Sequence, residues 1–388
     1  MKDLGLYIHI PFCAKKCDYC DFKSFENKDN LIDEYIKWLN YEIKSIGEGN
    51  KNDFNSNLDS LINLKTIYIG GGTPSFINSN YIKILLETIK NNFQMDENAE
   101  ITIEVNPGTV TREKLKDYKS VGINRLSVGS QSTNNRILKE IGRIHTYNDI
   151  TNTYNLARSM GFNNINLDLM IGLPKQTIDD VISSINDILE MNPEHISVYS
   201  LILEEGTKFY EKWEKNELIL PNDEEERNMY WAVKKMLEKA GYIHYEISNF
   251  AKPGFESKHN LDCWNQKEYI GVGVAAHSYT NNIRYSNIDN IEQYIQNYKN
   301  GSELDNLVFH EKQDIQNKMK EYMILGLRKI DGIHIQEFKR KFGNNPIILF
   351  KNELDKLVKE DLIEIDGDII KLTFKGLDLA NLVWEEFI

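Results

Sequence analysis

The stretch "YIHIPFCAKKCDYCDF", residues 7–22, holds three of the four cysteines of the chain. An apolar, β-rich run ends just before a loop in which Cys13, Cys17 and Cys20 follow a C-x3-C-x2-C spacing. Such a loop can wrap three thiolates around one cubane, so that each thiolate binds one iron and the fourth iron has no protein ligand. The stretch therefore predicts a 4Fe-4S cluster with one open iron, where a small molecule can bind.

Structural zinc and inert thiols are the alternatives to a cluster in this loop. Structural zinc prefers four ligands, whereas the loop supplies three, so Cys263 or a histidine would have to complete such a site. Four cysteines are too few for a disulfide scaffold in a chain of 388 residues, and a reducing cytosol keeps them as thiols. The spacing therefore favours metal or redox chemistry.

Composition and charge limit the partners and the location of the protein. Its 46 basic and 59 acidic residues leave a net charge of −13, and no dense Lys/Arg block compensates, so nucleic acid is not expected as a partner. The start of the chain lacks the apolar core of a signal peptide, and no apolar run reaches the ~20 residues of a spanning helix. We therefore expect a cytoplasmic protein, at most peripheral at a membrane.

Short β-rich runs alternate with amphipathic helical stretches over the first half of the chain. Parallel strands need connections of about a dozen residues, which these stretches supply. The runs are apolar on both faces, as expected for a sheet buried under helices. The pattern predicts an α/β fold, a partial (β/α)6 barrel, with strands in LYIHI, TIYIG, ITIEV, RLSVG, INLDLMIG and HISVYSL.

Polar loops lie at or just beyond the C-terminal ends of these predicted strands. Sites in parallel α/β folds gather at those ends, so the loops are expected to line a single mouth. The loops are the cysteine loop, GGGTPS (70–75), EVNPGT (104–109), GSQS (129–132), DLMIGLPKQT (168–177) and EEGT (204–207).

Two further regions are predicted after the barrel, which covers residues 1–210. A mixed extension, residues 211–305, carries the stretch HNLDCW (259–264). Residues 306–388 alternate between helix and strand patterns and predict a C-terminal winged-helix-like α+β module. This module is not strongly basic, so packing or partner binding is expected of it rather than DNA reading.

The cysteine loop, its HIPFC lead-in and the later loops resemble the radical S-adenosylmethionine (SAM) superfamily. Within it, the chain is similar over nearly its whole length to the group of oxygen-independent coproporphyrinogen III oxidases and related heme chaperones, the HemN/HemW group. The resemblance implies that SAM occupies the open iron through its amino and carboxylate groups. An electron from the cluster can then cleave SAM to a 5′-deoxyadenosyl radical.

The resemblance also implies which residues contact SAM. Glycines without Cβ allow the backbone to approach the methionine moiety, and charged or polar side chains match the other groups of SAM. The implied set is Tyr7, Gly71, Gly72, Thr73, Glu104, Gln131, Arg143 and Asp168. Taken singly, each of these residues can also serve the fold alone: a Gly-rich turn commonly joins strand to helix, Glu104 or Asp168 can cap a helix, and Arg143 can lie on the surface.

Two features separate the heme chaperones of this group from the oxidases. The oxidases resemble C-x3-C-x2-C-x-C, whereas this chain has Phe22 in place of the fourth cysteine and reaches Cys13 without their longer N-terminal extension. HNLDCW resembles the H-N-x-x-Y-W motif of heme-binding members, and imidazole is a common ligand of heme iron. His259 is therefore the heme-ligand candidate, with a structural histidine as the alternative. Cys263 stands where the motif has Tyr and is either a buried small residue or a thiolate near the porphyrin.

We therefore expect a heme chaperone that binds a 4Fe-4S cluster, SAM and heme. The resemblance implies that it delivers heme to membrane-bound respiratory hemoproteins and receives electrons from a donor. The alternative is oxidative decarboxylation of coproporphyrinogen III, against which Phe22 and the short N-terminus count. The sequence leaves open whether SAM cleavage, and hence enzyme activity, belongs to the working cycle, and which oligomer forms.

Overall fold

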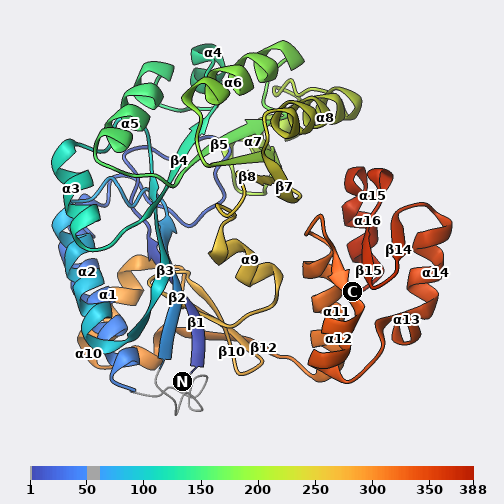
Figure 1. Ribbon diagram of the computed structural model, residues 1–388. Coiled ribbons are helices and arrows are strands. Elements are labelled where there is room, and N and C mark those ends of the chain that lie inside the picture. The colour runs from blue at the N-terminus through green and yellow to red at the C-terminus, as the bar shows by residue number, and fades with distance from the viewer. Residues whose placement is uncertain (1, 50–61) are drawn as a thin grey trace.

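The computed structural model describes residues 2–49 and 62–388 (Figure 1). Helices form an outer arc around a large central sheet, and a smaller module at the C-terminus lies to one side of it (Figure 1). None of the helices in the described residues is long and apolar enough to cross a bilayer.

Six parallel strands form the centre of the large sheet and confirm the predicted partial barrel. They are β1 (Lys2–Ile10), β2 (Ile62–Gly71), β3 (Gln94–Val105), β4 (Arg125–Gln131), β5 (Ile165–Ile171) and β6 (His195–Ser200). Each pairs with the next in chain order, for example with Leu6 opposite Ile67 and Ile103 opposite Leu126. Their apolar side chains are buried on both faces, because the barrel interior lies on one side and the helices on the other.

The helices between these strands pack one apolar stripe against the sheet. In α2 (Ser79–Asn92), Ile82, Leu86 and Ile89 recur at helical spacing and are fully buried. Thr146 and Thr177 start two of the other helices with capping boxes. The remaining helices here are α1 (Ile32–Gly47) after the 3-10 turn η1 (Asp29–Leu31), α3 (Arg112–Ser120), α4 (Asn135–Glu140), α5 (Tyr147–Ser159) and α6 (Ile178–Met191).

The region after β6 lengthens the same sheet at both edges. Its strands are β7 (Ile243–Glu246), β8 (Asn249–Ala251), β9 (Tyr269–Val272), β10 (His277–Thr280), β11 (Ile283–Asn287) and β12 (Leu307–Lys312). The strand order is β12-β11-β10-β9-β1-β2-β3-β4-β5-β6-β8-β7, so β9 covers the free edge of β1 and β8 that of β6. The barrel therefore stays open. The helices of this region are α7 (Lys208–Glu214), α8 (Asp223–Lys239), α9 (Lys258–Trp264), α10 (Ile291–Asn300) and the 3-10 turn η2 (Glu303–Asn306).

The C-terminal module has a core of its own, which includes the buried residues Met323, Phe338 and Leu357. An antiparallel hairpin of β14 and β15 lies in this module beside a third short strand, as the predicted helix-and-sheet pattern requires. Its elements are α11 (Ile315–Gly326), β13 (Ile333–His334), α12 (Ile335–Phe342), α13 (Pro346–Leu349), α14 (Lys351–Lys359), β14 (Ile363–Asp366), β15 (Ile369–Leu372), α15 (Phe374–Asp378) and α16 (Ala380–Glu385). The domain boundaries after residues 210 and 305 stay predictions.

Aromatic and cationic side chains join this module to the barrel. The rings of Trp231 and Phe374 stack with centroids 3.6 Å apart. The guanidinium of Arg328 lies 4.3 Å from the ring of Trp264 and 4.9 Å from that of Trp384. Because Trp264 ends α9, the HNLDCW stretch is held between the strands and the C-terminal module (Figure 1).

Candidate functional site

A cavity of about 340 Å³ opens at the C-terminal ends of the parallel strands. Its lining comes from the cysteine loop, from the segments after β2, β3, β4 and β6, as the placement of the polar loops predicts, and from residues within the strands. The predicted loop 168–177 contributes only Asp168 and Met170, and both lie within β5. Of the predicted site residues, those on the lining are Cys13, Cys17, Cys20, Gly71, Gly72, Thr73, Glu104, Gln131, Arg143 and Asp168.

The cysteine loop is anchored at both ends. The backbone N–H of Cys13 donates to the carbonyl of Phe25 (3.0 Å), and that of Phe25 donates to the carbonyl of Pro11 (2.7 Å). All three thiols of the loop are free. Burial raises the pKa of Cys20 to about 11 and also raises that of Cys13. Neither thiol therefore ionises readily without a cation, which iron supplies when a cluster binds.

Three free thiols on one anchored loop fit a cubane, in which each thiolate binds a different iron. Within residues 2–49 and 62–388, no group of three or more His, Cys, Asp or Glu side chains is arranged to hold a single metal ion.

The glycines after β2 leave room for this loop. A Cβ at Gly72 would lie 2.9 Å from the carbonyl O of Phe12 and 3.0 Å from Sγ of Cys13. Gly71 has φ of +116°, and a Cβ there would lie 2.7 Å from Cε1 of His9. These glycines are needed for packing against the first strand and its loop, in addition to any contact with a cofactor.

Thr73 connects two of the loops. Its Oγ1 lies 3.4 Å from Sγ of Cys13 and accepts a hydrogen bond of 2.9 Å from Nδ2 of Asn106. The loop after β3 is thereby held against the cysteine loop.

Two carboxyl groups face the cavity. Glu104 accepts hydrogen bonds from the hydroxyl of Tyr68 (2.9 Å) and the N–H of Gly71 (3.1 Å). Asp168 accepts one from Nδ2 of Asn166 (2.6 Å). Burial raises the pKa of Glu104 to about 7 and that of Asp168 to about 6. A cationic ligand would favour the ionised form of both groups.

Arg143 reaches from the loop after α4 to the cysteine loop. Its Nη1 donates to Sγ of Cys17 (3.4 Å), and its Nη2 donates to Oδ1 of Asn106 (3.3 Å) and to the carbonyl of Gly129. The alternative that Arg143 is a surface residue is therefore wrong. Gln131, at the end of β4, has a left-handed backbone (φ 65°), next to an irregularity in the pairing of β4 with β5.

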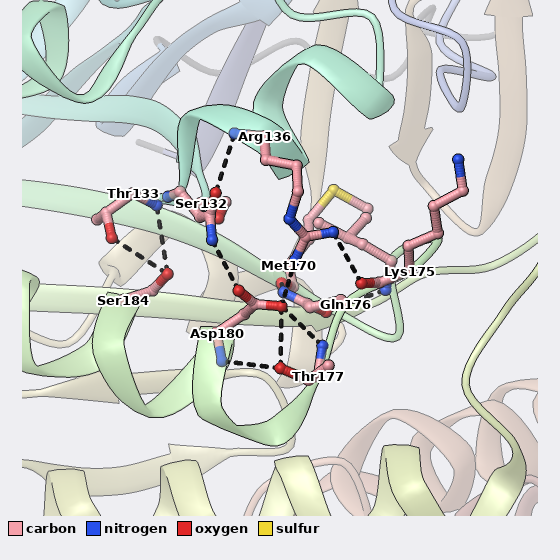
Figure 2. A network of polar contacts seen from close by, with 11 residues as sticks. Ser132, Thr133, Arg136, Met170, Lys175, Gln176, Thr177, Asp180 and Ser184 are labelled. Atoms are coloured by element: carbon pink, nitrogen blue, oxygen red, sulfur yellow. Dashed lines mark hydrogen bonds and ion pairs between the residues drawn. The ribbon is translucent and has the colours of Figure 1, made fainter.

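A polar network outside the cavity fixes the loops after β4 and β5 (Figure 2). Asp180, in the first turn of α6, accepts hydrogen bonds from Nδ2 of Asn134 and Nη2 of Arg136, both at 2.7 Å. Gln176 donates from Nε2 to the carbonyl of Met170, a lining residue (3.0 Å). The network thus joins the loop after β4 to the loop after β5.

Tyr7 and His259 lie behind the cavity wall, and neither is on the lining. The hydroxyl of Tyr7 is 2.9 Å from Nδ1 of His9, and its ring stacks on Tyr68 at 6.3 Å. The buried imidazole of His259 has Nδ1 2.8 Å from Oγ1 of Thr66 and also stacks on Tyr68, at 5.2 Å. The structure therefore shows a packing role for His259, and its role as heme ligand stays a prediction.

Cys263 is also off the lining, and burial raises the pKa of its thiol to about 12. Asn260 does line the cavity. Of the HNLDCW stretch, this residue alone reaches the cavity.

Several lining residues are missed by the sequence pattern because they lie inside strands, where a polar side chain in an apolar run carries no motif. Strand pairing shows which of them point inward: Ser127 and Asn166 are opposite each other in β4 and β5. The additional polar lining residues include Tyr68, Arg125, Ser127, Asn166, Ser197 and Tyr199.

Comparison with known proteins agrees with this site. Residues 7–188 match the Radical SAM superfamily, and residues 314–379 match the HemN C-terminal domain. The chain therefore belongs to the radical SAM superfamily and, within it, to the HemN/HemW family. Membership implies a 4Fe-4S cluster and SAM as cofactors.

The similar proteins include two full-length relatives. The heme chaperone HemW of Lactococcus lactis is 36% identical over 387 residues, which cover 100% of this chain and 98% of that protein. The heme chaperone HemW of Bacillus subtilis is 38% identical over 386 residues, which cover 98% of each. The coproporphyrinogen III oxidase HemN of Escherichia coli has the same fold, with a TM-score of 0.85 at 24% identity over 100% of this chain and 90% of that one.

Proposed function

We propose that this protein binds heme at the mouth of the cavity and delivers it to a hemoprotein. The full-length similarity to proteins named heme chaperone HemW supports this function. The acceptors in this proposal are membrane-bound respiratory hemoproteins, and a separate protein donates electrons to the cluster.

The structural observation that carries the proposal is an apolar rim at the mouth. Phe22 is 64% exposed, Ile202 68% and Tyr199 40%, and all three line the cavity. Large apolar side chains exposed around a cavity mark a binding surface. A porphyrin offers the flat apolar face that such a rim covers.

The resident cofactors belong below this rim. We assign Cys13, Cys17 and Cys20 to the cluster. SAM is assigned to Gly71, Gly72, Thr73, Glu104, Gln131, Arg143 and Asp168, with Tyr7 acting through the ring of Tyr68. When bound, a reduced cluster supplies the electron that cleaves the sulfonium of SAM.

The chain's own residues prepare this site for a cation. SAM carries an ammonium and a sulfonium, and the two buried carboxyl groups of Glu104 and Asp168 face the cavity. A positive ligand would draw both into the ionised form, whereas Arg143 lies beside Cys17 and suits a carboxylate. The site thus offers carboxyl groups to the positive groups of SAM and a guanidinium to its carboxylate.

The test compares heme affinity in rim variants of the anaerobically reconstituted protein. Removal of an apolar contact surface costs about 1.5–3 kcal/mol per large side chain, so Phe22→Ser and Ile202→Ser should each weaken binding by about tenfold or more in a Soret titration. Ile348→Ser is the control, because Ile348 is 75% exposed in α13 and off the cavity. Equal affinity of both rim variants and the wild type would overturn the proposed binding surface.

A further inference from the structure

His195 is a fully buried histidine just behind the cavity wall. It is the first residue of β6 and is 0% exposed, and it is not on the cavity lining. Strand pairing places it opposite Asn166 of β5, which does line the cavity. Burial, followed by the nearby charge of Arg125, holds the pKa of His195 well below its usual range. The imidazole is therefore neutral and carries a single N–H.

The hydrogen bonds of this imidazole decide which of its nitrogens carries the proton. Nε2 lies 2.8 Å from the hydroxyl of Tyr245, which also accepts a hydrogen bond of 3.3 Å from the backbone N–H of Ser257. A backbone N–H can only donate, so among the described residues the hydroxyl proton of Tyr245 has Nε2 of His195 as its acceptor. His195 therefore carries its own proton on Nδ1.

This proton fixes the orientation of the Asn166 amide. Nδ1 of His195 donates to Oδ1 of Asn166 at 2.7 Å, and the hydroxyl of Ser197 donates to the same oxygen at 3.2 Å. Nδ2 of Asn166 therefore points the other way and donates to Oδ1 of Asp168 (2.6 Å) and to the hydroxyl oxygen of Ser127 (2.8 Å). A reversed amide would present its oxygen to the carboxyl group of Asp168, which could then bond it only when protonated.

The bond from Asn166 acts on the charge of Asp168. Burial raises the pKa of this carboxyl group to about 6, and the hydrogen bond from Asn166 is the largest of the effects that oppose burial. Without this donor, the carboxyl group would stay protonated to a higher pH. The other charged and titratable side chains that act on Asp168 or sense its charge are Arg125, Arg143, Glu104, Tyr68 and Tyr199.

We propose that His195 is a positioning residue for SAM: it orients the amide of Asn166, which in turn keeps the carboxylate of Asp168 available as an acceptor for the cofactor. The inference rests on the proposed assignment of Asp168 to SAM. Because His195 is off the cavity lining, its effect on the cofactor passes through Asn166.

The experiment measures SAM affinity by equilibrium dialysis at pH 6 and pH 8, on the full-length protein with its cluster reconstituted anaerobically. His195→Leu removes the donor, and His195→Phe, the second apolar variant, keeps a ring without nitrogens. His195→Asn, which is close to leucine in size, offers a side-chain amide that can donate to Asn166. Heme is titrated in the same proteins by its Soret band.

His244→Leu is the matched control. His244 is also a buried histidine, in β7, but its Nε2 lies 3.2 Å from the carbonyl of Ile247 and the residue is off the cavity. Glu104, whose pKa is raised to about 7, titrates in every one of these proteins, so the comparison uses only the difference between variants at each pH.

Loss of a hydrogen bond to a charged group changes the acid dissociation of a carboxyl group by roughly tenfold. His195→Leu and His195→Phe should therefore bind SAM about fivefold more weakly than the wild type at pH 6, and within about twofold of it at pH 8, where Asp168 is ionised in all of them. His195→Asn should recover most of the affinity at pH 6, and His244→Leu should match the wild type at both pH values. In an Asp168→Asn background, His195→Leu should have no further effect, because its effect passes through that carboxyl group.

Three results would overturn the proposal. One is wild-type affinity at pH 6 in the apolar variants of His195. Another is a loss of equal size at both pH values that His195→Asn does not recover, because His195 would then only support the fold. The third is wild-type SAM affinity in Asp168→Asn, which would remove Asp168 from the cofactor site. The heme titration decides on the proposed function separately: a wild type that binds SAM but no heme removes that function and leaves the comparison of His195 variants intact.

Discussion

The guanidinium of Arg143 donates a hydrogen bond to Sγ of Cys17, 126 residues away along the chain, at 3.4 Å. The contact joins the loop after α4 to the cysteine loop, and it places a positive charge beside one proposed iron ligand. Hydrogen bonds to ligand sulfurs tune the reduction potential of an iron–sulfur cluster, because they stabilise the more negative, reduced state.

Arg143→Met should therefore make the cluster harder to reduce. We expect a midpoint potential lower by tens of millivolts, measured by an EPR-monitored redox titration of the reconstituted protein. Arg136→Met is the matched control, since Arg136 bonds Asp180 in the network of Figure 2 and does not reach the cysteine loop. Equal potentials in all three proteins would show that the Arg143 contact does not act on the cluster.

A side chain at Gly72 should interfere with the cluster loop. A Cβ there would lie 3.0 Å from Sγ of Cys13 and 2.9 Å from a backbone oxygen, so Gly72→Ala should reduce the iron and the visible absorbance bound after reconstitution by half or more. Gly206→Ala is the control, because a Cβ at Gly206 meets nothing within 4 Å and tests backbone strain alone. Full iron content in Gly72→Ala would mean that the loop can shift to accept the methyl group.

Glu104 should give the ligand-free protein a particular pH dependence. Its pKa is raised from 4.5 to about 7 in the folded protein, first by burial, in surroundings that include Tyr68, Asp168 and Arg125. Between about pH 4.5 and 7 the folded protein keeps a proton that the unfolded chain releases, so the free energy of unfolding falls as pH rises through this window. The amide side chain in Glu104→Gln does not titrate, so the variant lacks this contribution to the pH dependence.

The measurement is urea unfolding of wild type and Glu104→Gln at pH 5 and pH 7.5. The stability of the wild type relative to the variant should be highest at pH 5 and should fall by pH 7.5. A stability difference that is the same at both pH values would mean that Glu104 titrates in its ordinary range.

His259 has two separable roles to test. Removal of its packing on Tyr68 and its contact with Thr66 should cost His259→Ala about 2–4 kcal/mol of unfolding free energy, whereas Thr66→Val should lose only the hydrogen bond, about 1 kcal/mol. If His259 also binds heme iron, the Soret band of bound heme should change in His259→Ala but not in Thr66→Val. A Soret band unchanged in both variants would remove His259 from the heme site.

The position of the site can be predicted from the sequence, because several of its residues lie at or just after the ends of apolar runs. Cys13 follows β1 and Glu104 lies next to the end of β3, and parallel strands bring such positions to one edge. Arg125 and Asn166 lie within runs, where only the register of paired strands shows that they face the cavity. No local pattern could reveal them.

The HNLDCW stretch shows that a motif alone does not reveal the surroundings of its residues in the fold. A short motif predicts which residue types occur together, but the burial of its histidine depends on Thr66 and Tyr68 in β2, almost two hundred residues earlier in the chain. Likewise, the edge strands β8 and β9 are short, and the sequence does not show that they pair with β6 and β1.

The most direct test of the central claim offers the two tetrapyrroles to the same protein. Anaerobically reconstituted wild type, with SAM and a reductant, receives either heme, followed by the Soret band, or coproporphyrinogen III, followed by the formation of protoporphyrinogen IX. The proposed function predicts a saturable Soret band and no protoporphyrinogen. Turnover of coproporphyrinogen III without a heme band would contradict it.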